Sequence, residues 1–189
     1  MCDDLRPEYD NGMIEKWIKG ETGFPFLDAC MKFLQTNGWI NFRMRAMIMS
    51  FASYNMWQPW QKTSPLLAEL FTDYEPGIHI SQVQMQSGVT GINLPRIYSV
   101  TKQSMDQDPN ADWIKSQIPK LREFDPKLIH EANLNNSYIP KIVDLKESAK
   151  FARDQVWSIR KNKHFKNEAK LVYLKHGSRR KRRLTASQR

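Results

Sequence analysis

The hydrophobic pattern of residues 21–60 predicts two consecutive amphipathic helices that meet at a Gly-Trp corner. In the first helix, the apolar residues recur at the spacing of one helical face: Phe26, Cys30, Phe33 and Leu34. Gln35-Thr36-Asn37-Gly38 predicts the end of this helix, because glycine accepts the left-handed backbone conformation of a C-cap. We expect the second helix over residues 41–57, where the same apolar pattern is carried by Met44, Met47, Ile48 and Phe51.

The rest of the chain also shows helical signals and almost no strand signals. Ser64-Pro65 has the pattern of a cap followed by a first-turn proline, and Asp144 with Glu147 has the pattern of a capping box. The further helices that we expect span residues 13–18, 65–71, 78–86, 109–118, 144–161 and 168–175. The expected fold class is therefore all-α, with one domain of 189 residues or one domain with a tail.

Two arginines interrupt the apolar pattern of the second helix. Arg43 and Arg45 are two positions apart, which is about 200° around a helix, so they point to different sides. A guanidinium group close to a core is costly unless a carboxylate or a ligand meets it. The alternative is that each arginine packs its stem and leaves its charged group in water.

A pair of carboxylates precedes an unusually polar helix. Asp73 and Glu75 lie in a loop, and residues 78–86 include His79 and the amides Gln82, Gln84 and Gln86. So many hydrogen-bonding groups make a poor core element and predict the wall of a ligand site. A solvated surface helix is the alternative explanation.

The charge of the chain is concentrated at its C-terminal end. The net charge is +9, but residues 175–189 hold seven lysines or arginines and no acid, whereas the remaining residues hold 22 basic and 20 acidic groups. The run Arg179 to Arg183 repels itself and predicts an extended, disordered basic tail. This tail either binds phosphates or acts only as a solubilising segment.

Several classes of protein lack support in the sequence. The chain has no phosphate-binding glycine motif, no HExxH, no CxxC and no GxSxG, and its four histidines are scattered, so we expect no metal site. No run of 18 apolar residues and no secretory signal is seen, and the two cysteines give no disulfide framework. We therefore expect an intracellular, cytoplasmic protein in which Cys30 is a small core residue.

The order of these motifs resembles the FAD-binding domain of the photolyase/cryptochrome family. The resemblance runs from about Pro7 to Gly177 and rests on the following segments: Glu21-Thr22-Gly23-Phe24-Pro25, Thr36-Asn37-Gly38-Trp39, Arg43-Met44-Arg45, Asp73-Tyr74-Glu75-Pro76-Gly77-Ile78-His79, Gln84-Met85-Gln86, Arg96-Ile97-Tyr98 and Asp106-Gln107-Asp108-Pro109. It implies a flavoprotein in which light-excited reduced FAD donates an electron to a pyrimidine dimer flipped out of DNA.

The resemblance also implies roles for single residues. It places Arg45, paired with Asp73, near the flavin ring, with Glu75, Trp39 and His79 as further cofactor contacts. His79 stands where many family members have an asparagine facing flavin N5, and Trp60 matches one electron-relay tryptophan, for which Trp57 is a second candidate. The residues implied to contact DNA or the lesion are Arg43, Phe42 and Met85, and the tail adds Arg179 and Arg180.

The sequence also departs from the family pattern. Phe42 stands where many photolyases have asparagine, and Val83 stands where a relay tryptophan is usual. The resemblance covers only the C-terminal portion of the helical domain, without the antenna domain. We therefore expect two parts, residues 1–177 for this portion of the domain and residues 178–189 for the basic tail. Three hypotheses follow: a photolyase portion completed by a separate chain that supplies the N-terminal half, a cryptochrome-like photoreceptor without repair activity, or an inactive fragment.

Overall fold

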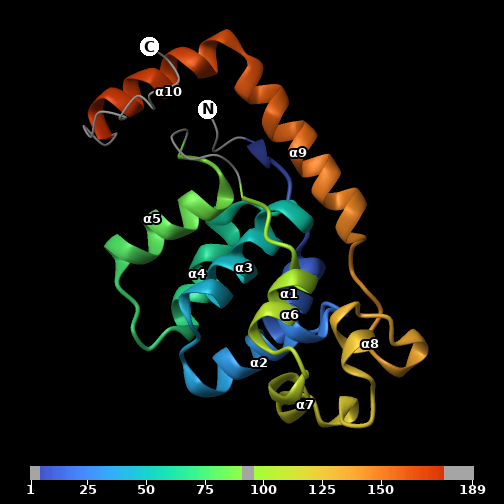
Figure 1. The fold of residues 1–189 in the computed structure, drawn as a ribbon. Coiled ribbons are helices and arrows are strands. Elements are labelled where there is room, and N and C mark those ends of the chain that lie inside the picture. Colours follow the sequence, from blue (N-terminus) through green and yellow to red (C-terminus); the bar gives the residue numbers. More distant parts are fainter. Residues whose placement is uncertain (1–4, 91–95, 177–189) are drawn as a thin grey trace, which may run out of the picture.

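The computed structural model describes residues 5–90 and 96–176, and every regular element in these ranges is helical (Figure 1). The expected all-α class is therefore confirmed. The elements are α1 (Asn11–Lys19), α2 (Pro25–Asn37), α3 (Phe42–Ser50), the π-helix η2 (Phe51–Asn55), α4 (Trp60–Leu70), α5 (Pro76–Ser87), α6 (Val100–Gln107), α7 (Asp112–Gln117), η3 (Pro119–Leu121), α8 (Pro126–His130), η4 (Asn135–Ser137), α9 (Leu145–Lys161) and α10 (Lys163–His176).

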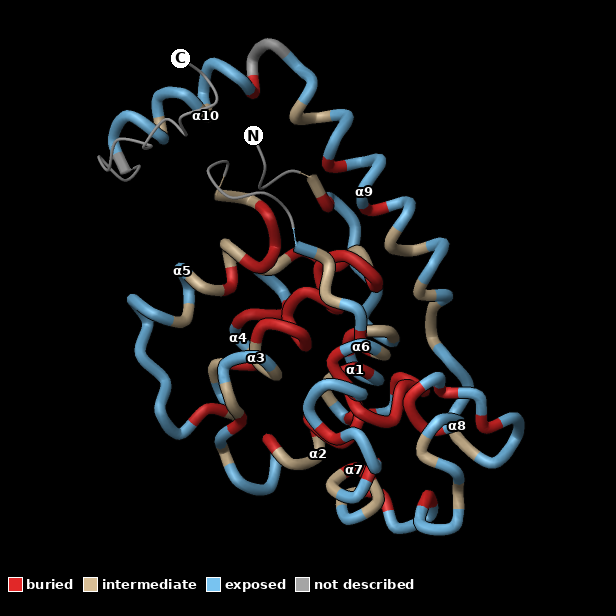
Figure 2. The backbone as a smooth tube through the Cα atoms, viewed as in Figure 1, coloured by how far each residue is buried: buried red, intermediate tan, exposed pale blue. Residues whose placement is uncertain are grey.

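Helix α2 forms the centre of the core, as its apolar pattern predicts. Phe26, Cys30 and Leu34 are buried, and α2 packs against α1, α3, α6, α7 and α8 (Figure 2). Gly38 ends the helix with φ 69°, and its N–H donates to the carbonyl of Leu34. A Cβ at Gly38 would lie 2.3 Å from the side chain of Thr72, so glycine is required by both its backbone angle and its close neighbour.

The second predicted helix is divided into two parts. Helix α3 ends at Ser50 and continues as a π-helical turn, in which the N–H of Met56 donates to the carbonyl of Phe51 at 3.0 Å. Trp57 then adopts a positive φ of 56° and ends the segment. The helical pattern thus ends close to the expected position, but its last turn is wider than an α-helix.

Several predicted boundaries are wrong. Helix α4 begins at Trp60, five residues before the predicted start, and Pro65 lies inside it. Helix α6 was not predicted, because only Val100 and Met105 are apolar in its sequence. Helix α7 begins after Asp108-Pro109, although Asp108 still accepts hydrogen bonds from two N–H groups of that helix.

Helix α9 runs along one side of the body, and α10 turns from its end and runs across the top of the view (Figure 1). Asp144 caps α9 as expected, accepting hydrogen bonds from the N–H groups of Lys146 and Glu147. Ala152 and Val156 are the buried residues of α9, which packs against η2 and α10. Within residues 5–90 and 96–176, no helix combines the length and hydrophobicity needed to cross a bilayer.

Candidate functional site

A cavity of about 390 Å³ lies between the Gly38–Asn41 corner, α3, the loop 71–75 and α5. This volume falls within the range of about 300–1,000 Å³ that is common for ligand sites. The cavity gathers six of the residues that the sequence singled out: Trp39, Phe42, Arg45, Asp73, Glu75 and His79. Residues that are distant in sequence therefore meet at one concave surface.

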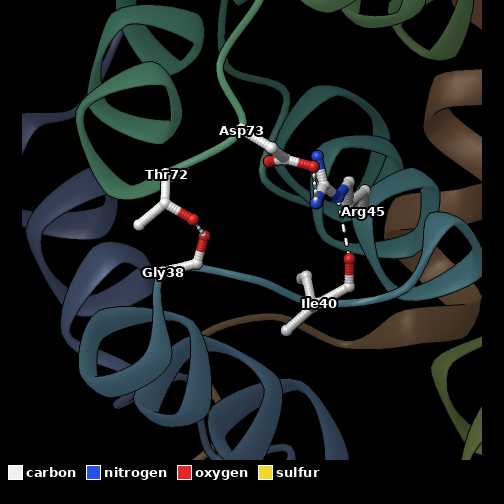
Figure 3. A network of polar contacts seen from close by, with 5 residues as sticks. All are labelled: Gly38, Ile40, Arg45, Thr72 and Asp73. Atoms are coloured by element: carbon white, nitrogen blue, oxygen red, sulfur yellow. Dashed lines mark hydrogen bonds and ion pairs between the residues drawn. The ribbon is translucent and has the colours of Figure 1, made fainter.

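Arg45 is the central charged group of this cavity (Figure 3). Its Nη2 lies 2.9 Å from Oδ2 of Asp73, and its Nε donates to the carbonyl of Ile40 at 2.8 Å. The guanidinium carbon also lies 4.2 Å from the centroid of the Phe71 ring. These contacts offset the free-energy cost of removing the guanidinium group from water, because its charge contacts a carboxylate, a carbonyl and a π-face.

The Arg45–Asp73 pair is supported by the backbone around it. The N–H and the hydroxyl of Thr72 both donate to the carbonyl of Gly38, at 2.9 and 3.2 Å, and Figure 3 draws the hydroxyl contact. These bonds tie the loop 71–75 to the corner that precedes α3. The hydrogen bond from Arg45 holds the pKa of the Asp73 carboxyl below its ordinary value. Asp73 is therefore ionised at neutral pH and keeps the guanidinium group oriented along the cavity wall.

Glu75 and His79 enter the cavity from the start of α5. Glu75 is the N-cap, and its Oε2 accepts a hydrogen bond from the N–H of Ile78 at 2.7 Å. His79 Nε2 lies 3.1 Å from the carbonyl oxygen of Ser64 and 3.0 Å from its hydroxyl. Because a carbonyl can only accept, the contact with the Ser64 carbonyl favours the tautomer with the proton on Nε2 and the unprotonated nitrogen at Nδ1.

The protonation of His79 is set by its surroundings. Burial lowers the pKa of His79, the positive charge of Arg45 lowers it further, and the Ser64 carbonyl opposes both effects. The ring also packs edge to face against Tyr74, with centroids 5.3 Å apart. His79 is therefore a neutral, oriented ring at pH 7.

Gln82 supplies a polar group that still lacks a partner. It lines the cavity from α5, and its Oε1 is buried without a hydrogen bond among the described residues. A buried acceptor of this kind is costly unless a donor reaches it. The amide-rich sequence of α5 predicted such a wall, and Gln82 is the residue that best fits a ligand N–H group.

The remaining predicted site residues lie outside this cavity. Arg43 is exposed and Met85 is half-buried, but neither lines the cavity. Trp60 lines a neighbouring hollow together with Tyr74, which borders both spaces. Trp57 packs against Phe151 on α9 instead, with ring centroids 5.2 Å apart. Arg179 and Arg180 lie outside the described residues.

Sequence reasoning missed several apolar walls of the cavity. Phe71, Tyr74 and Ile78 line it, and Trp39 and Phe42 at its edge are 51% and 59% exposed. All of these residues are large, apolar and close to the polar motif in sequence. Sequence alone cannot distinguish such residues from residues of the hydrophobic core. The combination of aromatic faces, an arginine–carboxylate pair and an orphaned amide oxygen fits a planar, polar, aromatic ligand such as a flavin ring. Among the described residues, no group of His, Cys, Asp and Glu is placed to hold a metal ion.

Comparisons with known proteins agree with this geometry. Residues 2–158 match the model of the FAD binding domain of DNA photolyase, which leaves α10 outside the match. A deoxyribodipyrimidine photo-lyase of Alkalihalophilus pseudofirmus is 31% identical over 130 residues, which is 68% of this chain and 27% of that protein. A cryptochrome DASH of Solanum lycopersicum is 29% identical over 140 residues, which is 72% of this chain and 24% of that protein.

A solved structure shows the same arrangement of helices. The archaeal photolyase of Sulfolobus tokodaii, whose crystal structure contains two FAD molecules, superposes with a TM-score of 0.75 at 26% identity. The similarity covers 80% of this chain and 36% of that one. The chain thus spans about a quarter to a third of the length of the proteins it matches. From its motifs, its helical fold and these matches, the chain belongs to the photolyase/cryptochrome family and carries part of its FAD-binding domain.

Proposed function

We propose that the cavity around Arg45 binds the isoalloxazine ring of FAD. The observation that carries this proposal is the convergence of six residues, singled out in the sequence, on one cavity. This cavity contains an ion pair and an acceptor that has no partner among the described residues. A flavin ring presents planar faces to aromatic side chains, and its edge carries both N–H donors and carbonyl acceptors. The cavity offers matching groups on each side.

Each polar residue has a distinct task in this proposal. Arg45, held by Asp73, offers positive charge to the ring edge that gains negative charge on reduction. The Gln82 oxygen and the Glu75 carboxylate accept from ring N–H groups, and His79 offers the unprotonated Nδ1 of its neutral ring. Trp39 and Phe42 border the cavity opening and present exposed aromatic faces to a ligand that enters it.

We further propose that the lineage function is light-dependent repair of pyrimidine dimers in DNA. When bound and reduced, FAD supplies the excited-state electron that splits the dimer. Arg43 is exposed one residue after Phe42 at the rim and is suited to contact a DNA phosphate. Trp60, beside Tyr74 at the neighbouring hollow, is the candidate for supplying electrons from the surface.

The boundaries of the functional unit are part of the same proposal. We assign residues 1–177 to the C-terminal part of the FAD-binding domain and residues 178–189 to a basic tail that adds charge for DNA. The exposed apolar rim, with Trp39, Phe42 and Ile78, is the surface on which a chain supplying the N-terminal half would pack.

A second candidate function is cryptochrome-like light sensing without repair. Two observations favour it: Phe42 occupies the rim position that many photolyases give to asparagine, and Val83 replaces a relay tryptophan at the cavity wall. Both changes leave the polar groups proposed to bind flavin in place and remove groups associated with repair and photoreduction.

A repair assay with bound flavin separates these functions. The 189-residue protein, purified and supplied with FAD, is illuminated with an oligonucleotide that carries one cyclobutane thymine dimer. Loss of the dimer in light but not in the dark supports repair. Retained flavin that responds to light while the dimer persists supports the photoreceptor instead, and absence of retained flavin contradicts both.

A further inference from the structure

A further hollow lies where α9 packs against η2 and beside residues 96–97. It has a volume of about 360 Å³. Its lining consists of Tyr54, Arg96, Ile97, Ala152, Arg153, Val156 and Trp157. None of these residues lines the cavity around Arg45, so the two sites are built from separate side chains.

The hollow is strongly positive. Arg96 and Arg153 are both exposed, and within the described part of the chain neither has a carboxylate within ion-pairing distance. The guanidinium groups of Arg6 and Arg160 also act on Tyr54, which lines this hollow. Burial raises the pKa of Tyr54 to about 12, and the charges of Arg6 and Arg160 oppose that rise. An anion that enters here therefore meets a converging positive potential without displacing an existing salt bridge.

The hollow also has aromatic and apolar walls. Trp157 is 43% exposed, which is high for an indole group, and it stands on α9 one turn after Arg153. Tyr54 is fully buried beneath the helix, and Val156 and Ala152 are buried between them. An exposed indole at the edge of an apolar floor is a stacking surface for a planar ring.

We propose that this hollow binds a nucleotide, with the base against Trp157 and the phosphates against Arg96 and Arg153. Two guanidinium groups that have no carboxylate partner among the described residues, together with an exposed indole, match the two halves of such a ligand. Phosphates accept paired hydrogen bonds from arginine forks, and bases stack on indole faces. The site does not depend on flavin binding, because it shares no side chain with the first cavity.

Calorimetric titration of the full chain with ATP tests this proposal. Arg153→Ala should weaken ATP binding by about tenfold or more, because a charge-assisted contact to phosphate is lost. Trp157→Ala should weaken it by a similar factor through loss of stacking, which is worth about 1–3 kcal/mol per base. Lys150→Ala removes an exposed cation from the same helix without touching the hollow, and it should leave the affinity within about twofold, as for a screened surface charge.

Two comparisons test whether ATP binding is specific to this hollow and to the base. Asp73→Asn, which alters the first cavity, should leave ATP binding unchanged, so loss of ATP binding in this variant would overturn the second site. Inorganic tripolyphosphate should bind at least about tenfold more weakly than ATP, because it lacks the stacking ring. Equal affinity would overturn recognition of the base.

A single-stranded oligonucleotide carries the same chemical groups as a free nucleotide. Preferential, Arg153-dependent binding of the strand over ATP would assign the hollow to nucleic acid and overturn the proposal of a free nucleotide ligand. The absence of ATP binding at millimolar concentration would overturn it as well.

Discussion

The hydroxyl of Tyr138 donates a hydrogen bond to Oδ2 of Asp28 at 2.9 Å, which joins residues 110 positions apart in the chain. The same carboxylate accepts from the N–H and hydroxyl of Thr22 and from the N–H of Gly23. Asp28 is fully buried at the start of α2. Burial raises the pKa of this carboxyl group, and the hydrogen bonds from its four donors oppose that rise.

Asp28→Asn should strongly destabilise the protein. An amide places an NH₂ group where the native carboxylate accepts hydrogen bonds, so at least one buried donor loses its partner. We expect the free energy of unfolding to fall by about 3 kcal/mol. Chemical denaturation followed by circular dichroism measures this change. Asp106→Asn is the matched control, since Asp106 makes only an exposed contact of 3.8 Å with Lys102. Equal stability of the two variants would show that the Asp28 network is unimportant.

Gln82→Met should separate ligand binding from stability. The substitution preserves length and removes the buried acceptor that has no partner among the described residues. The free energy of unfolding should stay constant or rise by about 1 kcal/mol, because an unsatisfied polar atom is lost. Retention of FAD after gel filtration should decrease. Gln84→Met, on the same helix but outside the cavity, should retain FAD as the native protein does. Equal retention by both variants would remove Gln82 from the site.

His79→Gln should flatten the dependence of stability on acidic pH. The pKa of His79 is lowered in the folded protein, chiefly by burial, so the unfolded chain takes up a proton first as pH falls. The stability associated with neutral His79 is present above its ordinary pKa of about 6.5 and is lost as pH falls through the folded value. Thermal unfolding measured from pH 7.5 downward should show a shallower loss in the variant. The same loss in both proteins would exclude His79 as a cause.

Deletion of residues 178–189 should weaken DNA binding mainly at low salt. The deletion removes six lysines or arginines, and each phosphate contact contributes about 0.9 to the slope of log affinity against log salt. If half of these cations contact DNA, the slope falls by about 3. Fluorescence anisotropy with duplex DNA gives the slope. Deletion of residues 184–188, which carry no charge, is the control, and an unchanged slope in the longer deletion would identify the tail as a solubilising segment.

The parts of the fold that sequence predicted are those with strong local signals. Gly38 ends α2 and Asp144 caps α9 because their local chemistry favours those positions in any context. Pro65 misled the prediction for α4. Its missing N–H costs little inside this helix, because the carbonyl it would have bonded belongs to exposed Gln61, which water can reach. The π-helical turn at Phe51–Asn55 has no sequence signal at all.

The candidate flavin site could be predicted in part because of the family motif, not because of local helix signals. The family motif placed Arg45, Asp73, Glu75 and His79 in one set, and the structure brings all four to one cavity. Local pattern could not show that Ser64 bonds to His79 from a separate helix, or that Trp57 packs against Phe151 instead of bordering the cavity. Such contacts depend on how helices cross, which residue spacing within one helix does not determine.

Flavin retention in Asp73→Asn and Asp106→Asn tests the central claim most directly. Each protein is mixed with FAD and passed through gel filtration, and the flavin absorbance is compared with that of the protein. The native chain and Asp106→Asn should keep the flavin bands. Asp73→Asn should lose most of them, because Arg45 loses the carboxylate that orients it. Equal retention in both variants, or a colourless native protein, would contradict flavin binding at this cavity.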